Sequence, residues 1–380
     1  MAGESLIPST WRTDWIAFGC AFTLSVLGLL TMDSFEAQNP YFVRQIIWLC
    51  IAVGIFFLAR RFDWRILRRT NIAVALYGLA TALLILLFVL GHVSRGAQSW
   101  FSFGAFSFEP AELANLALIV VLAKYFSRRH VEIGNLRHII VSGAYALILA
   151  IAVALQPNFG GAIIVVAIWF SMVLVSGLSR KHLLAVIAIG VLAFAGLWTF
   201  GFHAYQRERI LAFIHPLASS QGVGYQAYQA TIAVGSGELL GKGIGYGTQS
   251  TLRFLPEYQT DFMFAAFAEE WGFLGVVLLF ILYGVLFFRL LAASSRGATN
   301  FETLFTLGVL FYLAAHFVLH VGINMGLLPV TGTTIPFMSY GGSHLVIEFL
   351  ALGIVDGMRG YARAAHREEL DKEFSGGYDR

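Results

Sequence analysis

Residues 249–275 read QSTLRFLPEYQTDFMFAAFAEEWGFLG and combine a polar segment, a long apolar run and three acids near or inside that run. A polar segment leads through Asp261 into a long apolar run. Asp261 is therefore expected at a boundary between water and membrane, whereas Glu269 and Glu270 fall inside the apolar run. Ionisable side chains in a membrane segment are costly in free energy, so we expect a functional site here.

Composition places the whole chain in a membrane. Hydrophobic residues make up 58% of the 380 residues and charged residues 12%, and the mean hydropathy is +0.74. Soluble domains carry about 25% charged residues, so a soluble fold is excluded. The net charge of +3 is too small to indicate a nucleic-acid partner. Cys20 and Cys50 both lie in apolar runs and predict no disulfide.

The apolar runs predict an all-α integral membrane protein with about ten transmembrane helices, because one span needs roughly 20 residues. The first run is longer than a signal-peptide core, so we expect it to be retained. The chain is then one polytopic domain, 1–380, with a long loop at 203–261 between spans seven and eight and a tail at 359–380. The predicted spans are 15–32, 42–59, 71–91, 110–126, 138–155, 161–177, 182–202, 262–288, 303–325 and 343–358.

Basic residues in the short loops predict the orientation, because Lys and Arg mark the cytoplasmic side. The opposite short loops, 33–40, 156–160 and 326–341, hold neither Lys nor Arg. Both termini and the tail are therefore expected in the cytoplasm, and the long loop outside it. The basic residues are Arg60, Arg61, Arg65, Arg68, Arg69, Arg128, Arg129, Arg137, Arg180 and Lys181.

The long loop has features of a binding region. Residues 203–215 and 224–240 are amphipathic, which favours helices lying in the membrane interface. The glycine-rich residues 235–247 lack the spacing of a phosphate loop, so a flexible turn is the simpler interpretation. Four cations nevertheless share this loop and would suit a polyanion such as a diphosphate, namely Arg207, Arg209, Lys242 and Arg253.

Two further groups of polar residues lie near predicted span ends. His316, His320 and Asn324 share one helical face, and hydrogen bonds between helices are favoured over a metal site because no third ligand is evident. Glu109 and Glu112 flank the start of the fourth span, where capping explains both acids.

Two elements near the last spans carry alternatives. The loop 329–343 holds two prolines, three glycines and several hydroxyl groups, and it is expected to shape a cavity. For Asp261 the simpler interpretation is an N-terminal cap of the eighth span.

Taken together, several segments resemble the SEDS family, the shape, elongation, division and sporulation proteins typified by RodA and FtsW. Residues 205–211 are more similar to RodA than to FtsW. The ordered set of matching segments covers most of the chain and is specific. It comprises 96–100, 109–112, 156–157, 224–226, 237–249, 255–257, 260–262, 269–270, 324–332 and 336–343.

The resemblance implies a peptidoglycan glycosyltransferase of the bacterial inner membrane. Such a protein polymerises lipid II and acts with a class B penicillin-binding protein, a transpeptidase. Asp261 would be the essential catalytic acid. No nucleotide cofactor is implied, and a divalent cation such as Mg²⁺ or Mn²⁺ could assist. The candidate substrate-binding residues are Trp100, Glu112, Arg207, Arg209, Lys242, Gln249, Arg253, Ser339 and Ser343.

The chain departs from the family pattern at four places. Glu109 replaces a Gln, residues 158–161 read Asn-Phe-Gly-Gly in place of Asp-Leu-Gly-Thr, and His344 replaces a Ser. Asn115 stands where a Lys is usual, which removes the expected cationic partner of Glu112. An amide hydrogen bond from Asn115 to Glu112 is expected instead.

Forming a β-linked glycan from an α-linked lipid diphosphate inverts the anomeric carbon, so an acceptor hydroxyl must lose its proton to a base. Asp261 faces the correct compartment for that role, and nearby cations would stabilise the departing diphosphate. A flippase for the lipid-linked precursor is the alternative, with Glu112, Glu269 and Glu270 inside a central cavity. A non-catalytic scaffold for a cell-wall synthase is the third interpretation.

Overall fold

The computed structural model describes residues 13–34, 40–94, 97–103, 106–128, 136–202, 204–214, 222–252 and 254–375. Helices stand at all of the predicted span positions. They are α1 (Trp15–Asp33), α2 (Pro40–Ala59), α3 (Thr70–Leu90), α4 (Pro110–Ser127), α5 (Leu136–Ala154), α6 (Phe159–Val175), α7 (Arg180–Gly196), α11 (Met263–Ser294), α12 (Asn300–Asn324) and α13 (Gly342–Ser375).

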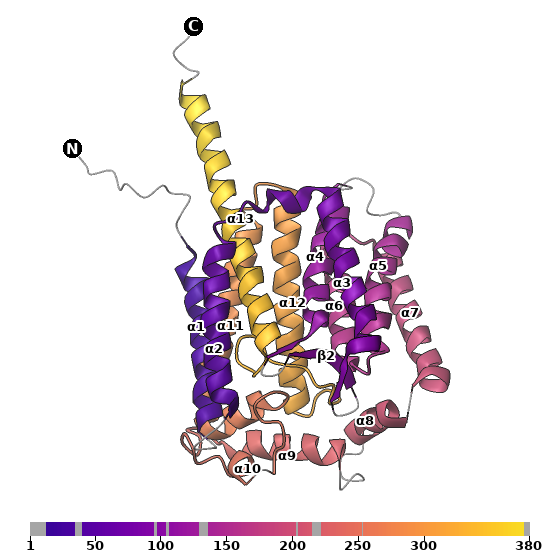
Figure 1. The fold of residues 1–380 in the computed structure, drawn as a ribbon, viewed down its shortest axis with the longest axis vertical. Helices are drawn as coiled ribbons and strands as arrows, with labels where there is room; N and C mark the ends of the chain where they lie inside the picture. Colours follow the sequence, from indigo (N-terminus) through magenta and orange to yellow (C-terminus); the bar gives the residue numbers. More distant parts are fainter. Residues whose placement is uncertain are drawn as a thin grey trace, which may run out of the picture.

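The predicted multi-pass helical fold is confirmed. Within the described residues, 8 helices are long and apolar enough to cross a membrane. The helix α6 is also apolar but has only 17 residues. The helix α13 occupies the last predicted span and continues beyond it (Figure 1). A 3₁₀ turn, η2 (Trp64–Arg68), precedes α3, and a π-helical segment, η3 (Leu197–Gly201), extends α7.

The long loop forms a layer across one end of the bundle. Three helices lie there, α8 (Ala204–Ile214), α9 (Val223–Ser236) and α10 (Thr248–Thr251), and Figure 1 shows them below the upright helices. The first helix starts, and the last helix ends, at the opposite end of the bundle (Figure 1). The two stretches that the sequence marks as amphipathic are therefore the helices α8 and α9.

A small antiparallel sheet at the same end was not predicted. It consists of β1 (His92–Ser94), β2 (Ala97–Phe103) and β3 (Phe106–Phe108), in the order β1-β2-β3. Phe101 pairs with Phe108 and Phe103 with Phe106, so the strands β2 and β3 form a tight hairpin. The segment joins α3 to α4 and carries Trp100.

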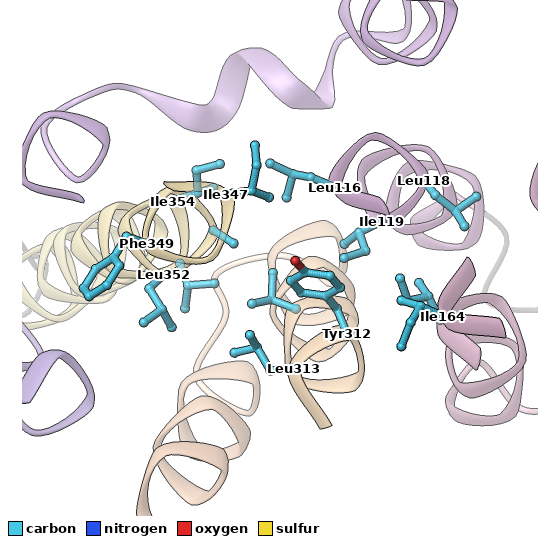
Figure 2. Packing of buried hydrophobic residues seen from close by; sticks show 14 of the residues in the cluster. Leu116, Leu118, Ile119, Ile164, Tyr312, Leu313, Ile347, Phe349, Leu352 and Ile354 are labelled. Atoms are coloured by element: carbon cyan, nitrogen blue, oxygen red, sulfur yellow. The ribbon is translucent and has the colours of Figure 1, made fainter. Parts of the chain in front are cut away.

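The helix α12 occupies the centre of the bundle and packs against α4, α6, α11 and α13. Figure 2 shows Tyr312 and Leu313 of α12 among apolar side chains of these neighbours. Tyr312 is 2% exposed. Close approach of α4 requires Gly308, because a Cβ there would lie 2.5 Å from Ile119 Cγ2. Small residues permit such contacts between membrane helices, where van der Waals packing supplies the attraction.

The two acids inside the apolar run hold the glycine-rich turn against α11. Glu269 Oε1 accepts a hydrogen bond from Lys242 Nζ at 2.6 Å, and Glu270 Oε1 accepts one from the Gly245 amide at 2.7 Å. The helix is kinked at Gly272, which has φ of 65°. A Cβ there would lie 2.1 Å from the Gly241 nitrogen, so only glycine permits this contact.

A network of ion pairs joins both ends of the chain at the other face of the bundle. Asp14 caps α1 and accepts hydrogen bonds from Arg289 of α11 and Arg359 of α13. Burial acts to raise the pKa of Asp14, but the two guanidinium groups outweigh it and hold that pKa below its usual value. The pairs thereby fix α1, α11 and α13 to one another.

Candidate functional site

A polar cavity of about 470 Å³ lies where the sheet, the long loop and the ends of α4, α12 and α13 meet. Five of the predicted site residues line it, and they come from segments far apart in the sequence. They are Trp100, Glu112, Arg209, Asp261 and Ser343.

Four other predicted site residues lie outside this cavity. Arg207 donates to the Thr199 carbonyl, and Lys242 and the Gln249 amide both bind Glu269. Ser339 is buried and donates to the Thr260 carbonyl at 2.7 Å, so it positions the residue next to Asp261. Arg253 lies outside the described residues.

Asp261 sits at the end of a tight turn before α11. The Glu257 carbonyl accepts hydrogen bonds from the amides of Thr260, Asp261 and Phe262. The N-cap position belongs to Phe262, and the early amides of the helix bind side chains of α12 instead. His320 Nε2 accepts from the Phe264 amide at 3.3 Å, and Asn324 Oδ1 accepts from the Ala265 amide at 3.0 Å.

This arrangement corrects the capping interpretation of Asp261. The amides that a capping aspartate would bind already have acceptors on α12. It also confirms that His320 and Asn324 act in hydrogen bonds between segments, since His320 Nδ1 lies 2.7 Å from the Thr333 carbonyl.

The loop 329–343 forms one wall of the cavity and is held from several sides. The Tyr340 backbone amide donates to the Gln259 carbonyl at 2.8 Å, and the Gln45 side-chain amide donates to the Ser339 carbonyl at 3.1 Å. Phe337 has φ of 62°, a conformation that costs about 1–3 kcal/mol for a residue other than glycine. Its amide donates to Glu348 Oε2 at 2.8 Å, which helps to hold this strained backbone.

Glu109 connects three walls of the cavity. Asn158 Nδ2 donates to Glu109 Oε1 at 2.8 Å, and the Glu109 amide donates to Ser343 Oγ at 3.2 Å. Burial and the nearby Glu112 carboxylate raise the pKa of Glu109, against the charge of His344 and hydrogen bonds from Asn158 and Trp100 that act to lower it. The sequence pattern alone indicates only helix capping for this acid.

Glu112 is buried and bound by residues of α12 and α13. Tyr312 donates to Glu112 Oε2 at 2.6 Å, and His344 Nδ1 lies 3.1 Å from Glu112 Oε1. Among the described residues, Asn115 Oδ1 has no hydrogen-bond partner. No hydrogen bond joins the Asn115 amide to Glu112 among the described residues, so that expectation is wrong, and Tyr312 and His344 lie beside Glu112 instead.

A second cavity of about 220 Å³ adjoins the first at Arg209, which lines both. Its walls are mostly apolar and come from α8, α9 and the residues that follow α12. They include Ala212, Phe213, Ala227, Met325, Leu328 and Val330.

The comparisons with known proteins agree with this geometry. The FtsW/RodA/SpoVE family, described as cell cycle proteins, matches residues 7–363. The chain belongs to this family. The peptidoglycan glycosyltransferase MrdB of Escherichia coli K12 is 36% identical over 298 residues, covering 78% of this chain and 79% of MrdB.

Two solved structures share the fold. One is a chain of a peptidoglycan synthase complex whose structure is described as coordinating polymerization and crosslinking. It aligns with a TM-score of 0.79 and 30% sequence identity, and the alignment covers 93% of this chain and 99% of that chain. The rod shape determining protein RodA of Thermus thermophilus has a TM-score of 0.70 at 30% identity, covering 93% and 98%.

Two of the departures from the family pattern form a reciprocal pair in space. Where the pattern has Gln and Asp, this chain has Glu109 and Asn158, so the amide and the carboxylate have exchanged sides. A hydrogen bond of 2.8 Å joins the Asn158 amide to the Glu109 carboxyl group. Asn158 also caps α6, since its Oδ1 accepts from the Gly161 amide, and Asp would cap equally well.

This exchange predicts strong coupling between the two positions. Above the raised pKa of Glu109, Asn158→Asp alone sets two carboxylates together and should lower the free energy of unfolding by about 1–3 kcal/mol, whereas Glu109→Gln with Asn158→Asp should restore it. Thermal unfolding of the purified variants in detergent measures this coupling.

The pH dependence provides the control. A folded-state pKa raised above the unfolded value costs stability as pH rises, and a protonated Glu109 can donate to Asp at position 158. The deficit of the single variant should therefore shrink as the pH falls through the raised pKa of Glu109. Single and double variants whose effects simply add would contradict the pairing.

Proposed function

We propose that this chain is a peptidoglycan glycosyltransferase that polymerises lipid II into glycan strands, in cell elongation and shape or in division. The observation that carries the proposal is Asp261 on a polar cavity that shares Arg209 with an apolar cavity. Its relatives of the same length are named for peptidoglycan glycosyltransfer, which supports the same reaction.

The two adjoining cavities suit the two halves of a lipid-linked sugar. The polar cavity offers hydroxyl, amide and carboxyl groups for a saccharide, and Trp100 offers an aromatic face. The apolar cavity offers a surface for part of an isoprenoid chain. A diphosphate joins those halves, and Arg209 lies at the junction, where a guanidinium can bind two phosphate oxygens.

Asp261 then has the position of a general base. It takes a proton from the acceptor hydroxyl as that oxygen attacks the anomeric carbon, and the lipid diphosphate leaves from the opposite face with inversion. Arg209 stabilises the charge that develops on the leaving group. Glu257 and Asp261 both line the cavity with oxygen donors that fit Mg²⁺ or Mn²⁺, and such a cation would neutralise further diphosphate charge.

The flippase interpretation finds less support. It needs Glu112, Glu269 and Glu270 around one transport cavity, but Glu269 and Glu270 bind the glycine-rich turn. Of these acids only Glu112 lines the polar cavity. A base and a cation that line the same cavity favour group transfer.

Replacing Asp261 by Asn tests the base directly. The amide keeps the size of the side chain but accepts no proton, so polymerisation of lipid II by the purified protein should fall at least about a hundredfold. Glycan product resolved on gels measures the rate, and in detergent no transport across a membrane can contribute.

Control variants separate the base from general damage. Asp63→Asn, on an exposed turn far from the cavity, should polymerise at the wild-type rate. Arg209→Ala should reduce the rate more than Arg207→Ala, because only Arg209 lines the cavities. A folded Asp261→Asn protein with near wild-type polymerisation would return the choice to flippase or scaffold.

The proposal includes an orientation in the bacterial inner membrane, with both termini cytoplasmic and the cavity outside. With Cys20 and Cys50 replaced, a Cys at the exposed Thr251 should react with an impermeant reagent added to intact spheroplasts. A Cys at the exposed Arg65 should react only after lysis. The opposite labelling pattern would refute this orientation.

A class B penicillin-binding protein is the proposed partner. The solved relative from a peptidoglycan synthase complex supports it, since that complex couples polymerization to crosslinking. A single-span transpeptidase is expected to dock on the membrane face or outer loops and to co-purify in a one-to-one complex after mild extraction. Recovery of the chain without any transpeptidase would count against this partner.

A further inference from the structure

We infer that Glu112, His316 and His344 form a binding site for a divalent transition metal ion such as Zn²⁺. One ligand atom from each residue lies within 4.8 Å of the others, and all three side chains are buried. The residues come from α4, α12 and α13, and each lines the polar cavity. Metal binding here does not depend on the proposed glycosyl transfer.

The hydrogen bonds of His316 leave one nitrogen for a ligand role. Its Nδ1 lies 3.3 Å from the Thr334 carbonyl, which can only accept, so Nδ1 carries the hydrogen. The lone pair is then on Nε2. This atom is buried without a hydrogen-bond partner among the described residues. A backbone carbonyl that fixes the tautomer in this way is the usual support of a metal-binding histidine.

His344 is placed between two carboxylates. Its Nε2 lies 2.9 Å from Glu348 Oε1, and its Nδ1 lies 3.1 Å from Glu112 Oε1. The Nε2 and Glu348 Oε1 atoms are close but form no aligned hydrogen bond, and without a hydrogen on Nδ1 that nitrogen and Glu112 Oε1 oppose each other with lone pairs. A cation must lie between them, either a proton or a metal ion.

His316 distinguishes those two cations. A proton on His344 Nδ1 faces Glu112 but leaves His316 Nε2 without a hydrogen-bond partner among the described residues. A metal ion satisfies Glu112, His316 and His344 together. It also balances charge, because a divalent ion neutralises the buried carboxylates of Glu112 and Glu348, whereas one proton leaves a net negative charge.

Ligand chemistry selects the class of metal. Two imidazoles and one carboxylate suit zinc and similar ions, whereas Mg²⁺ prefers oxygen ligands and retains water. Tetrahedral zinc holds its ligand atoms about 3.3 Å apart, so side-chain movements of roughly 1 Å complete the site. Three protein ligands leave a fourth position, which the cavity can supply with water or a substrate oxygen.

The experiment uses full-length, chelator-treated protein without a histidine tag, dialysed against Zn²⁺ or Co²⁺. We expect one metal ion per chain by elemental analysis, unaffected by excess Mg²⁺. The Co²⁺ form should show the intense visible absorption of a four-coordinate ion. This wild-type spectrum needs no variant, and the weak absorption of six-coordinate Co²⁺ would overturn the assignment.

Variants then locate the ion. His316→Gln can still donate to the Thr334 carbonyl, and His344→Ser introduces the residue usual in the family, so both are expected to fold. Each should weaken Zn²⁺ binding at least about a hundredfold, whereas His182→Gln, a histidine of α7 outside the cavity, should not. Absence of stoichiometric metal, or binding that survives both cavity variants, refutes the site and leaves His344 as a protonated partner of Glu112.

Discussion

Backbone that leaves the helical conformation inside a membrane bundle must find partners for its polar groups, and the whole cavity depends on this constraint. Two irregular segments, 257–262 and 329–343, meet that requirement largely through each other. Ser339 binds the Thr260 carbonyl, and the Tyr340 amide binds the Gln259 carbonyl. Side chains of α12 accept hydrogen bonds from the Phe264 and Ala265 amides at the start of α11. The position of Asp261 is therefore set by a network from several helices and not by a local turn alone.

The same constraint explains why acids in apolar runs are not equivalent. Glu269 and Glu270 satisfy amides and a lysine of the glycine-rich turn, so they stabilise the fold of the long loop. Glu112 instead lines the polar cavity and is bound by Tyr312 and His344. A buried carboxylate is costly in either place unless it is paired. Only its partners reveal whether it supports a loop or a site.

Departures from the family pattern make sense in pairs. Glu109 and Asn158 exchange the amide and carboxylate of one hydrogen bond, and His344 takes the place beside Glu112 that a lysine would hold. Neither compensation involves neighbours in sequence, since Glu109 and Asn158 lie on different elements and His344 lies on the last helix. The four departures look independent along the sequence. In the folded protein they involve two contacts, Glu109 with Asn158 and His344 with Glu112.

The sequence by itself determined the membrane class, the helices at all predicted span positions, the amphipathic helices of the long loop and the family. These follow from local properties, namely hydrophobic run length, periodicity and ordered motifs. Tertiary structure decided which candidate residues share a cavity. Those that line it are Trp100, Glu112, Arg209, Asp261 and Ser343. Those that lie outside it are Arg207, Lys242, Gln249 and Ser339. The small sheet, the true partner of Glu112 and the acceptors that cap α11 also required it. Each depends on distances between segments far apart in the chain, which no local pattern encodes.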